Sequence, residues 1–300
     1  RTVWTNRALR HRRRLAAAAP AYRGKQNGLG GIAGAERGRA MPEGHTIHRA
    51  ANQQRRMLAK KAVAVSSPQG RFADGAKQLD ARTCTSVEAF GKHLIYRFDD
   101  DRALHIHLGL FGKFKTKKRP EIEPKGAVRV RMLSETHCVD INGPNTCEIL
   151  DPAGLQKLVG RIGPDVLRND ADPERAFARI SKSRAPIGRL LMDQSVIAGI
   201  GNIYRTEILW RQRLHPDMPG NAIDRDMFES IWNDSVELLK IGVKRNAIIT
   251  VDGAAPSHLR YGERTNIFNK QTCPCCSGAV TRTEIAGRRA FLCETCQPLL

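Results

Sequence analysis

Residues 197–202 read Ile197-Ala198-Gly199-Ile200-Gly201-Asn202, and this stretch decides how the second half of the chain folds. Glycine adopts the backbone angles of a tight turn without a steric penalty, and asparagine is a favoured residue at the start of a helix. We predict a tight turn here, with Asn202 as N-cap of a helix that runs to about Arg213. A short helix over 186–194 precedes the turn. Two helices joined in this way direct backbone N–H groups toward a phosphate; the alternative is a turn that only connects two packed helices.

The flanking segments predict further helices after the turn and strands well before it. We expect helices over 172–181 and 225–240, because apolar residues of the latter share one face, as in an ordinary core. Between 61 and 150, short apolar runs broken by Gly, Asp and Pro indicate strands. The expected strands cover 94–98, 103–108, 127–133 and 147–150. A helix after Pro42 is indicated by the spacing of its apolar residues, Ile47, Ala50, Ala51, Met57 and Leu58.

The last part of the chain carries a metal-binding pattern. Two Cys-x2-Cys pairs, sixteen residues apart, comprise Cys273, Cys276, Cys293 and Cys296. Two such turns bring four thiolates into the tetrahedral arrangement that zinc prefers, and a closed four-thiolate site stabilises a fold and does not catalyse. Strands expected over 279–285 and 289–292, joined by Ala286-Gly287, complete a zinc-ribbon hairpin. Cys275 is the one rival to Cys276 as a ligand.

His105 and His107 are two apart on an expected strand and therefore face the same way. Such a pair suits a metal, but the sequence shows no third ligand for it. We therefore expect a structural role for these histidines.

The tetrapeptide Met41-Pro42-Glu43-Gly44 suggests a nucleophile. A chain that begins at Pro42 has a free secondary amine, and an α-amino group titrates near ~8 where a lysine titrates near ~10.4. Such an amine attacks electrophilic carbon and forms a Schiff base, and Glu43 is placed to act as the acid. The alternative is an ordinary start codon followed by the first turn of a helix.

Residues 1–40 bear directly on this nucleophile, because the Pro42 nitrogen is an amide while they are attached. They hold ten Lys or Arg and one acid, Glu36, with a Gly-rich end. Such a composition is typical of a disordered segment. We expect residues 1–41 to be a leader that is disordered or missing from the mature protein.

The composition points to a polyanionic partner. The net charge is +20, and most of the excess lies outside the leader. A charge of that size indicates nucleic acid. The sequence has no apolar run as long as a membrane span. Clustered cysteines without a secretory signal favour a reducing compartment.

Three motifs occur in order: Pro42-Glu43-Gly44, the Gly-x-Gly-Asn turn and the terminal zinc hairpin. Together they resemble the formamidopyrimidine-DNA glycosylase/endonuclease VIII family over about 42–297. The resemblance implies an α+β fold, with an N-terminal β-sandwich flanked by helices, a helix–two-turn–helix domain and a zinc finger, and with DNA bound in the cleft between the domains. The implied divisions are a leader at 1–41, a catalytic domain at 42–160, a linker at 161–171, a helical domain at 172–258 and the finger at 259–300.

The resemblance also assigns roles to individual residues. It implies that Pro42 is the Schiff-base nucleophile and Glu43 the proton donor, that Lys92 contacts phosphate and assists elimination, and that Arg288 serves the phosphate and the δ-elimination. DNA-binding roles are implied for a further set: Asn202 at the two-turn motif, Arg161 as a linker arginine, and Leu110 and Phe111 as the wedge that fills the gap of a flipped base.

Two departures from the family pattern concern specificity. His45-Thr46 stands where the family often has Pro-Glu, which removes a carboxylate near the nucleophile. The stretch 140–145 lacks the arginine pair of the purine-oxidation branch. The second departure favours the endonuclease VIII branch and oxidised pyrimidines.

The sequence thus predicts a bifunctional DNA glycosylase/AP lyase of base excision repair. We expect one structural zinc ion, a double-stranded DNA partner with damaged bases or abasic sites, a monomer, and a cytoplasmic, nucleoid-associated location. The alternatives are a non-catalytic zinc-ribbon protein that binds nucleic acid, and a lesion-binding relative whose leader blocks catalysis.

Overall fold

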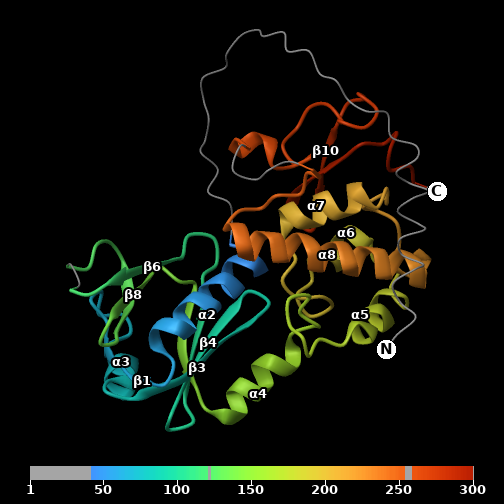
Figure 1. Ribbon diagram of the computed structural model, residues 1–300. Coiled ribbons are helices and arrows are strands. Elements are labelled where there is room, and N and C mark those ends of the chain that lie inside the picture. The colour runs from blue at the N-terminus through green and yellow to red at the C-terminus, as the bar shows by residue number, and fades with distance from the viewer. Residues whose placement is uncertain (1–41, 121–122, 254–258, 300) are drawn as a thin grey trace.

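The computed structural model describes residues 42–120, 123–253 and 259–299, so the expected leader lies outside the described residues. Its first half is a sandwich of two antiparallel sheets (Figure 1). The five-stranded sheet has the order β1-β3-β4-β5-β9 and the four-stranded sheet the order β2-β7-β8-β6. The strands are β1 (Lys61–Ala62), β2 (Ala64–Ser66), β3 (Thr83–Phe90), β4 (His93–Phe98), β5 (Ala103–His107), β6 (Lys113–Lys118), β7 (Val128–Leu133), β8 (His137–Asn142) and β9 (Thr146–Leu150).

The sandwich core forms because alternate strand residues point inward. Leu94, Leu104 and Ile106 of the larger sheet meet Val130 and Val139 of the smaller sheet in one buried cluster. The four strands expected from the sequence are confirmed to within one residue at each end. Helix α3 (Ala73–Leu79), which interrupts the strands, was not expected. It buries only Ala76 and Leu79, too few residues to produce a clear helical pattern.

The second half is helical and contains α4 (Pro152–Arg161), α5 (Pro173–Ile180), α6 (Ile187–Leu190), α7 (Asn202–Arg211) and α8 (Arg225–Arg245). Helix α8 extends five residues beyond its expected end and stops at Asn246, whose φ of 54° is left-handed. Helix α4 was not expected; Asp151 caps its start, since its side chain accepts a hydrogen bond from Gly154 N. Arg161 is therefore the last residue of a helix, where the sequence had placed the beginning of a linker.

The C-terminal hairpin consists of β10 (Thr281–Ile285) and β11 (Arg288–Leu292). Ala286 and Gly287 connect them with φ values of 53° and 70°. Positive φ at both central residues is what a tight two-residue hairpin turn requires. The expected zinc-ribbon hairpin is thus confirmed as a backbone structure, and it lies against α7 (Figure 1).

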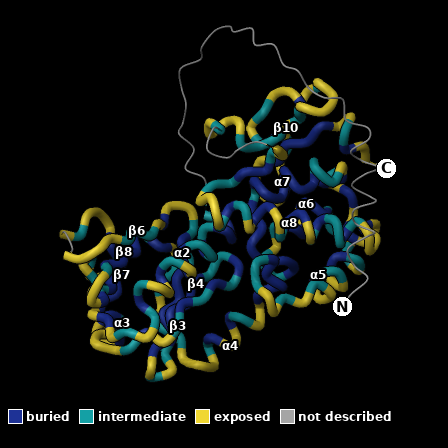
Figure 2. The backbone as a smooth tube through the Cα atoms, in the orientation of Figure 1, coloured by how far each residue is buried: buried dark blue, intermediate teal, exposed yellow. Residues whose placement is uncertain are grey.

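Helix α2 (Gly44–Leu58) joins the two halves, because it packs on β3 and also contacts α8 (Figure 1). Arg49 donates hydrogen bonds to Val243 O and Lys244 O, which are carbonyls in the last turn of α8. Gly44 N donates to Gly199 O at 2.8 Å. The start of α2 is thereby fixed to the turn that precedes α7. Helix α7 is buried along most of its length (Figure 2).

Among the described residues, no helix is both long and apolar enough to cross a bilayer.

The contact between Gly44 and Gly199 predicts a large effect of one methyl group. A Cβ on Gly44 would lie 2.6 Å from Gly199 Cα, so Gly44→Ala should lower the free energy of unfolding by about 1–3 kcal/mol through overpacking. Gly160 in α4 is the matched control, because a Cβ there would meet nothing within 4 Å. Gly160→Ala should raise stability by roughly 0.5–1 kcal/mol. Urea unfolding measures both; equal stability of Gly44→Ala and the unchanged protein would contradict this packing.

Candidate active site

Glu43 directly precedes α2 and is 1% exposed. Its Oε1 accepts a hydrogen bond from Ile203 N at 3.0 Å, in the first turn of α7. A Cβ on Gly201 would lie within 3 Å of the Glu43 carboxyl group, so only glycine admits this close approach. The carboxylate therefore lies at the positive end of α7, where the helix dipole favours negative charge.

The expected N-cap at Asn202 is wrong. Asn202 is the first residue of α7 and Gly201 is its N-cap, without a side chain to accept a hydrogen bond. Glu43 from α2 satisfies the free N–H of Ile203 instead. The Asn202 side chain donates to Arg289 O at 3.0 Å and so connects α7 to the zinc hairpin.

Lys92 faces Glu43 from the turn between β3 and β4. Burial raises the pKa of Glu43, and the Lys92 ammonium, followed by the N–H groups of α7, only partly opposes that rise. Burial also lowers the pKa of Lys92; the Glu43 charge opposes this shift and the Arg288 charge adds to it. A carboxyl group with a raised pKa and an amine with a lowered pKa thus lie close together, which is a common property of catalytic sites.

The turn that carries Lys92 is held from two sides. Gly91 has a φ of 58°, and a Cβ on it would lie 3.0 Å from Ala198 Cβ. On the other side, Gly91 N donates to Asp165 Oδ2 at 2.7 Å. The same oxygen accepts from His48 Nε2 of α2, also at 2.7 Å. The sequence offered no signal for Asp165 or His48, because these contacts join distant parts of the chain.

Arg205 is a third residue that the sequence did not reveal. It is 1% exposed and donates to Asn202 Oδ1 at 2.5 Å and to Arg289 O at 3.1 Å. Burial lowers its pKa to about 10, while the nearby Glu43 charge opposes the shift. Together, Asn202 and Arg205 fix the hairpin strand that begins with Arg288 beside the buried carboxyl group.

Pro42 lines a cavity of about 390 Å³ that also contains the expected wedge residues. Leu110 is 52% exposed and Phe111 74% exposed, on the turn between β5 and β6. Their exposure leaves both apolar side chains accessible to a partner at this cavity. The structure thus brings Pro42, Leu110 and Phe111 to one opening.

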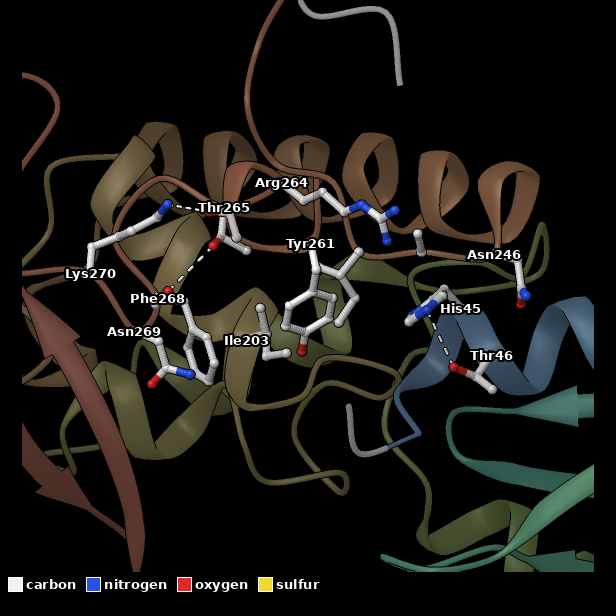
Figure 3. A pocket seen from close by; sticks show the side chains of 13 residues that line it. His45, Thr46, Ile203, Asn246, Tyr261, Arg264, Thr265, Phe268, Asn269 and Lys270 are labelled. Carbon is white, nitrogen blue, oxygen red and sulfur yellow. Dashed lines mark hydrogen bonds between the residues drawn. The ribbon is translucent and has the colours of Figure 1, made fainter. Parts of the chain in front are cut away.

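A second cavity, of about 350 Å³, lies on the other side of Thr46. Figure 3 shows His45 and Thr46 of α2 facing Tyr261 and Arg264 from the segment after α8. Burial lowers the pKa of His45 to about 4, so its ring is neutral at pH 7. Both residues that depart from the family pattern therefore line this cavity. Thr46 and Asn246 line the Pro42 cavity as well.

Three histidines, His93, His105 and His107, share one sheet face with Glu148, and the Arg161 charge acts on His93 and His105. His93 and His105 hydrogen-bond through their rings at 2.8 Å, and His105 Nδ1 lies 2.8 Å from Glu148 Oε1. Burial and then His105 lower the pKa of His93 to about 3, so that ring is neutral. These contacts agree with the expected structural role of His105, and the rings of His93 and His107 lie 5.0 Å apart.

The four expected cysteines converge, with their sulfur atoms within 4.8 Å of one another. Cys275 is exposed and outside this group. The Trp210 indole donates to Cys273 Sγ at 3.4 Å and so connects α7 to the site. Four convergent sulfur donors fit a tetrahedral zinc ion. Within the described ranges, only these cysteines bring three or more His, Cys, Asp or Glu ligand atoms that close.

Comparison with known proteins agrees with this architecture. Residues 41–146 match the family model of the formamidopyrimidine-DNA glycosylase N-terminal domain, and residues 162–252 match that of the formamidopyrimidine-DNA glycosylase H2TH domain. Endonuclease 8 1 of Mycobacterium tuberculosis is 45% identical over 267 residues, which cover 86% of this chain and all of that protein. The chain belongs to the formamidopyrimidine-DNA glycosylase/endonuclease VIII family.

Further similar proteins cover three quarters or more of this chain. The formamidopyrimidine-DNA glycosylase of Thermomicrobium roseum is 29% identical over 248 residues, which cover 75% of this chain and 85% of that protein. A Lactococcus lactis glycosylase in complex with DNA containing N7-benzyl-Fapy-dG aligns with a TM-score of 0.72 and 21% identity, over 86% of this chain and all of that one. This structure establishes the shared fold. The family relationship makes the chain a DNA glycosylase and AP lyase of base excision repair.

The cysteine geometry predicts which substitution removes a metal. Cys276→Ser should release one zinc ion per chain and loosen the hairpin, because metal binding supplies folding energy in such modules. Cys275→Ser is the matched control, since this neighbouring thiol lies outside the cluster. Zinc stoichiometry by atomic emission distinguishes the two variants. If Cys275→Ser loses the metal and Cys276→Ser retains it, the ligand assignment is wrong.

Proposed function

We propose that this glycosylase removes oxidised pyrimidines through a Schiff base on Pro42 and cuts the strand by β- and then δ-elimination. The observation that carries the proposal is the buried Glu43 carboxyl group, which lies near Lys92 and directly follows Pro42, the residue that lines the cavity. A proton donor with a raised pKa next to a nucleophile is the arrangement that base excision requires.

The mechanism follows from these groups. The Pro42 amine attacks C1′ of a flipped nucleotide while Glu43 gives its proton to the sugar or the leaving base. Loss of the base and ring opening leave an iminium between Pro42 nitrogen and C1′. This cation makes the C2′ proton acidic, and its removal expels the 3′ phosphate; a second elimination expels the 5′ phosphate. Water then releases the sugar fragment and regenerates the amine.

The second cavity is the proposed site of the flipped base. It shares the lining residues Thr46 and Asn246 with the Pro42 cavity, so it lies next to the place where the sugar would be held. Its wall beside the nucleophile carries the neutral His45 ring and the Thr46 hydroxyl, where the family often has a carboxylate. The lack of the arginine pair at 140–145 supports pyrimidines over purines.

The remaining roles concern the DNA backbone and the metal. We assign the phosphate contacts to Lys92, Asn202, Arg161 and Arg288, and the wedge to Leu110 and Phe111. One zinc ion held by the four cysteines keeps the hairpin that begins with Arg288 in place. The proposed partner of the protein is damaged double-stranded DNA. We propose that the protein binds it as a monomer and is cytoplasmic and nucleoid-associated. The domain divisions given from the sequence are part of the same proposal.

The amine mechanism predicts that residues 1–41 matter for chemistry. Protein that begins at Pro42 should excise 5-hydroxyuracil or dihydrouracil and form a covalent adduct with DNA under borohydride. The 300-residue form should bind the same DNA without an adduct, because its Pro42 nitrogen is an amide. Equal adduct yields from both forms, with the longer one proven intact by mass spectrometry, would exclude the terminal amine. Binding without excision by either form would favour a non-catalytic lesion-binding protein.

The raised pKa of Glu43 predicts the pH dependence of base excision. Because Glu43 must be protonated to donate, the single-turnover excision rate should fall as pH rises through its raised pKa. Glu43→Gln should lower excision by a factor of roughly 10²–10⁴ and abolish this falling limb, while DNA affinity is retained. A duplex with a pre-formed abasic site is the control substrate, since no base has to leave it. Near-normal excision by Glu43→Gln would show that Glu43 has a structural role and does not act as the acid.

A further inference from the structure

Asp165 lies between α4 and α5, outside the residues to which the mechanism assigns chemistry, and is 3% exposed. Its two oxygens accept three hydrogen bonds from three parts of the chain. Oδ2 accepts from Gly91 N and from His48 Nε2, each at 2.7 Å, and Oδ1 accepts from Leu167 N at 2.9 Å. A buried carboxylate with this many donors is an ordered junction, because leaving it unpaired costs several kcal/mol.

Two of these donors belong to elements that carry proposed catalytic groups. Gly91 immediately precedes Lys92, so the bond to Gly91 N fixes the turn from which the lysine extends. His48 lies one helical turn beyond Gly44 on α2, the helix that Pro42 and Glu43 precede. One carboxylate oxygen therefore joins the support of Lys92 to the support of Pro42 and Glu43.

The two supports differ in how far they depend on Asp165. The start of α2 has two further anchors, the bond from Gly44 N to Gly199 O and the bond from Ile203 N to Glu43. The turn at Gly91 is closed by the pairing of Phe90 with His93 in the β3–β4 ladder, and the bond from Gly91 N to Asp165 ties the turn itself to the helical half of the chain. Loss of the Asp165 carboxylate should therefore loosen Lys92 more than it loosens Pro42 or Glu43.

We propose that Asp165 is a positioning residue that holds Lys92 in register with Pro42 and Glu43. This inference rests on the proposed function, in which Lys92 assists elimination. It assigns Asp165 no contact with DNA. A displacement of about 1 Å at a catalytic group can cost roughly a hundredfold in rate. Asp165 should therefore affect strand cleavage more than base excision.

The experiment uses protein that begins at Pro42 and measures two single-turnover rates. One is excision of 5-hydroxyuracil; the other is strand cleavage at a pre-formed abasic site. Asp165→Asn should lower cleavage by roughly 10–100-fold and excision by much less, with unchanged affinity for a tetrahydrofuran duplex. Asp170→Asn is the matched control, because this carboxylate of the same segment is exposed and pairs with Arg168. It should leave both rates and the affinity unchanged.

A double-mutant cycle with Lys92→Ala decides whether Asp165 acts through the lysine. If it does, Asp165→Asn should lower cleavage in the unchanged protein and have no further effect in the Lys92→Ala background. Equal losses of excision and cleavage, or multiplicative effects of the two substitutions, would overturn the proposal. His48→Leu, which leaves the Gly91 bond in place, should show a smaller loss with the same dependence on Lys92, and it replaces Asp165→Asn if that variant does not fold. Failure of the unchanged protein to form a borohydride adduct would instead refute the proposed function.

Discussion

The buried Glu43 carboxyl group at the start of α7 is the contact on which the rest of the site depends. It joins the residue that precedes α2 to a helix 160 positions later in the chain, through Ile203 N. Burial raises its pKa, whereas the helix N-terminus and Lys92 favour its charge. A carboxyl group under two opposing influences can gain and lose a proton during a reaction, which suits a general acid.

That contact is sterically available only because glycine lies opposite it. Gly201 leaves room for the Glu43 side chain, and Gly44 lets α2 approach Gly199. Hydrogen bonds of polar side chains add to these close contacts. Asp165 holds the turn that carries Lys92, and Asn202 with Arg205 holds the hairpin strand that begins with Arg288. The Asp165 junction connects the β3–β4 turn to α2, and the Asn202–Arg205 junction connects the hairpin to α7. The catalytic geometry is therefore a product of the packing between modules and belongs to no single one of them.

Local patterns in the sequence predicted what local physics determines. The cysteine spacing, the two-residue hairpin turn and the alternating strands depend on neighbours within a few residues, and all are confirmed. The N-cap at Asn202 failed because a carboxylate from a distant segment took the position. Asp165 and His48 were missed because their contact spans 117 residues. Arg205 was missed because a buried arginine is rare and its partner Arg289 O comes from the distant hairpin. Helix α4 was missed because it buries only Leu155 and Leu158.

The central claim is that the Pro42 nitrogen forms the covalent bond to the sugar. Lys92 is the rival amine, since burial lowers its pKa and it lies near the same carboxyl group. The most direct measurement is tandem mass spectrometry of the peptide that carries the sugar after borohydride reduction of protein beginning at Pro42. The account predicts the added mass on the N-terminal residue, Pro42, with Lys92 unmodified. Modification of Lys92 with an unmodified Pro42 would contradict it.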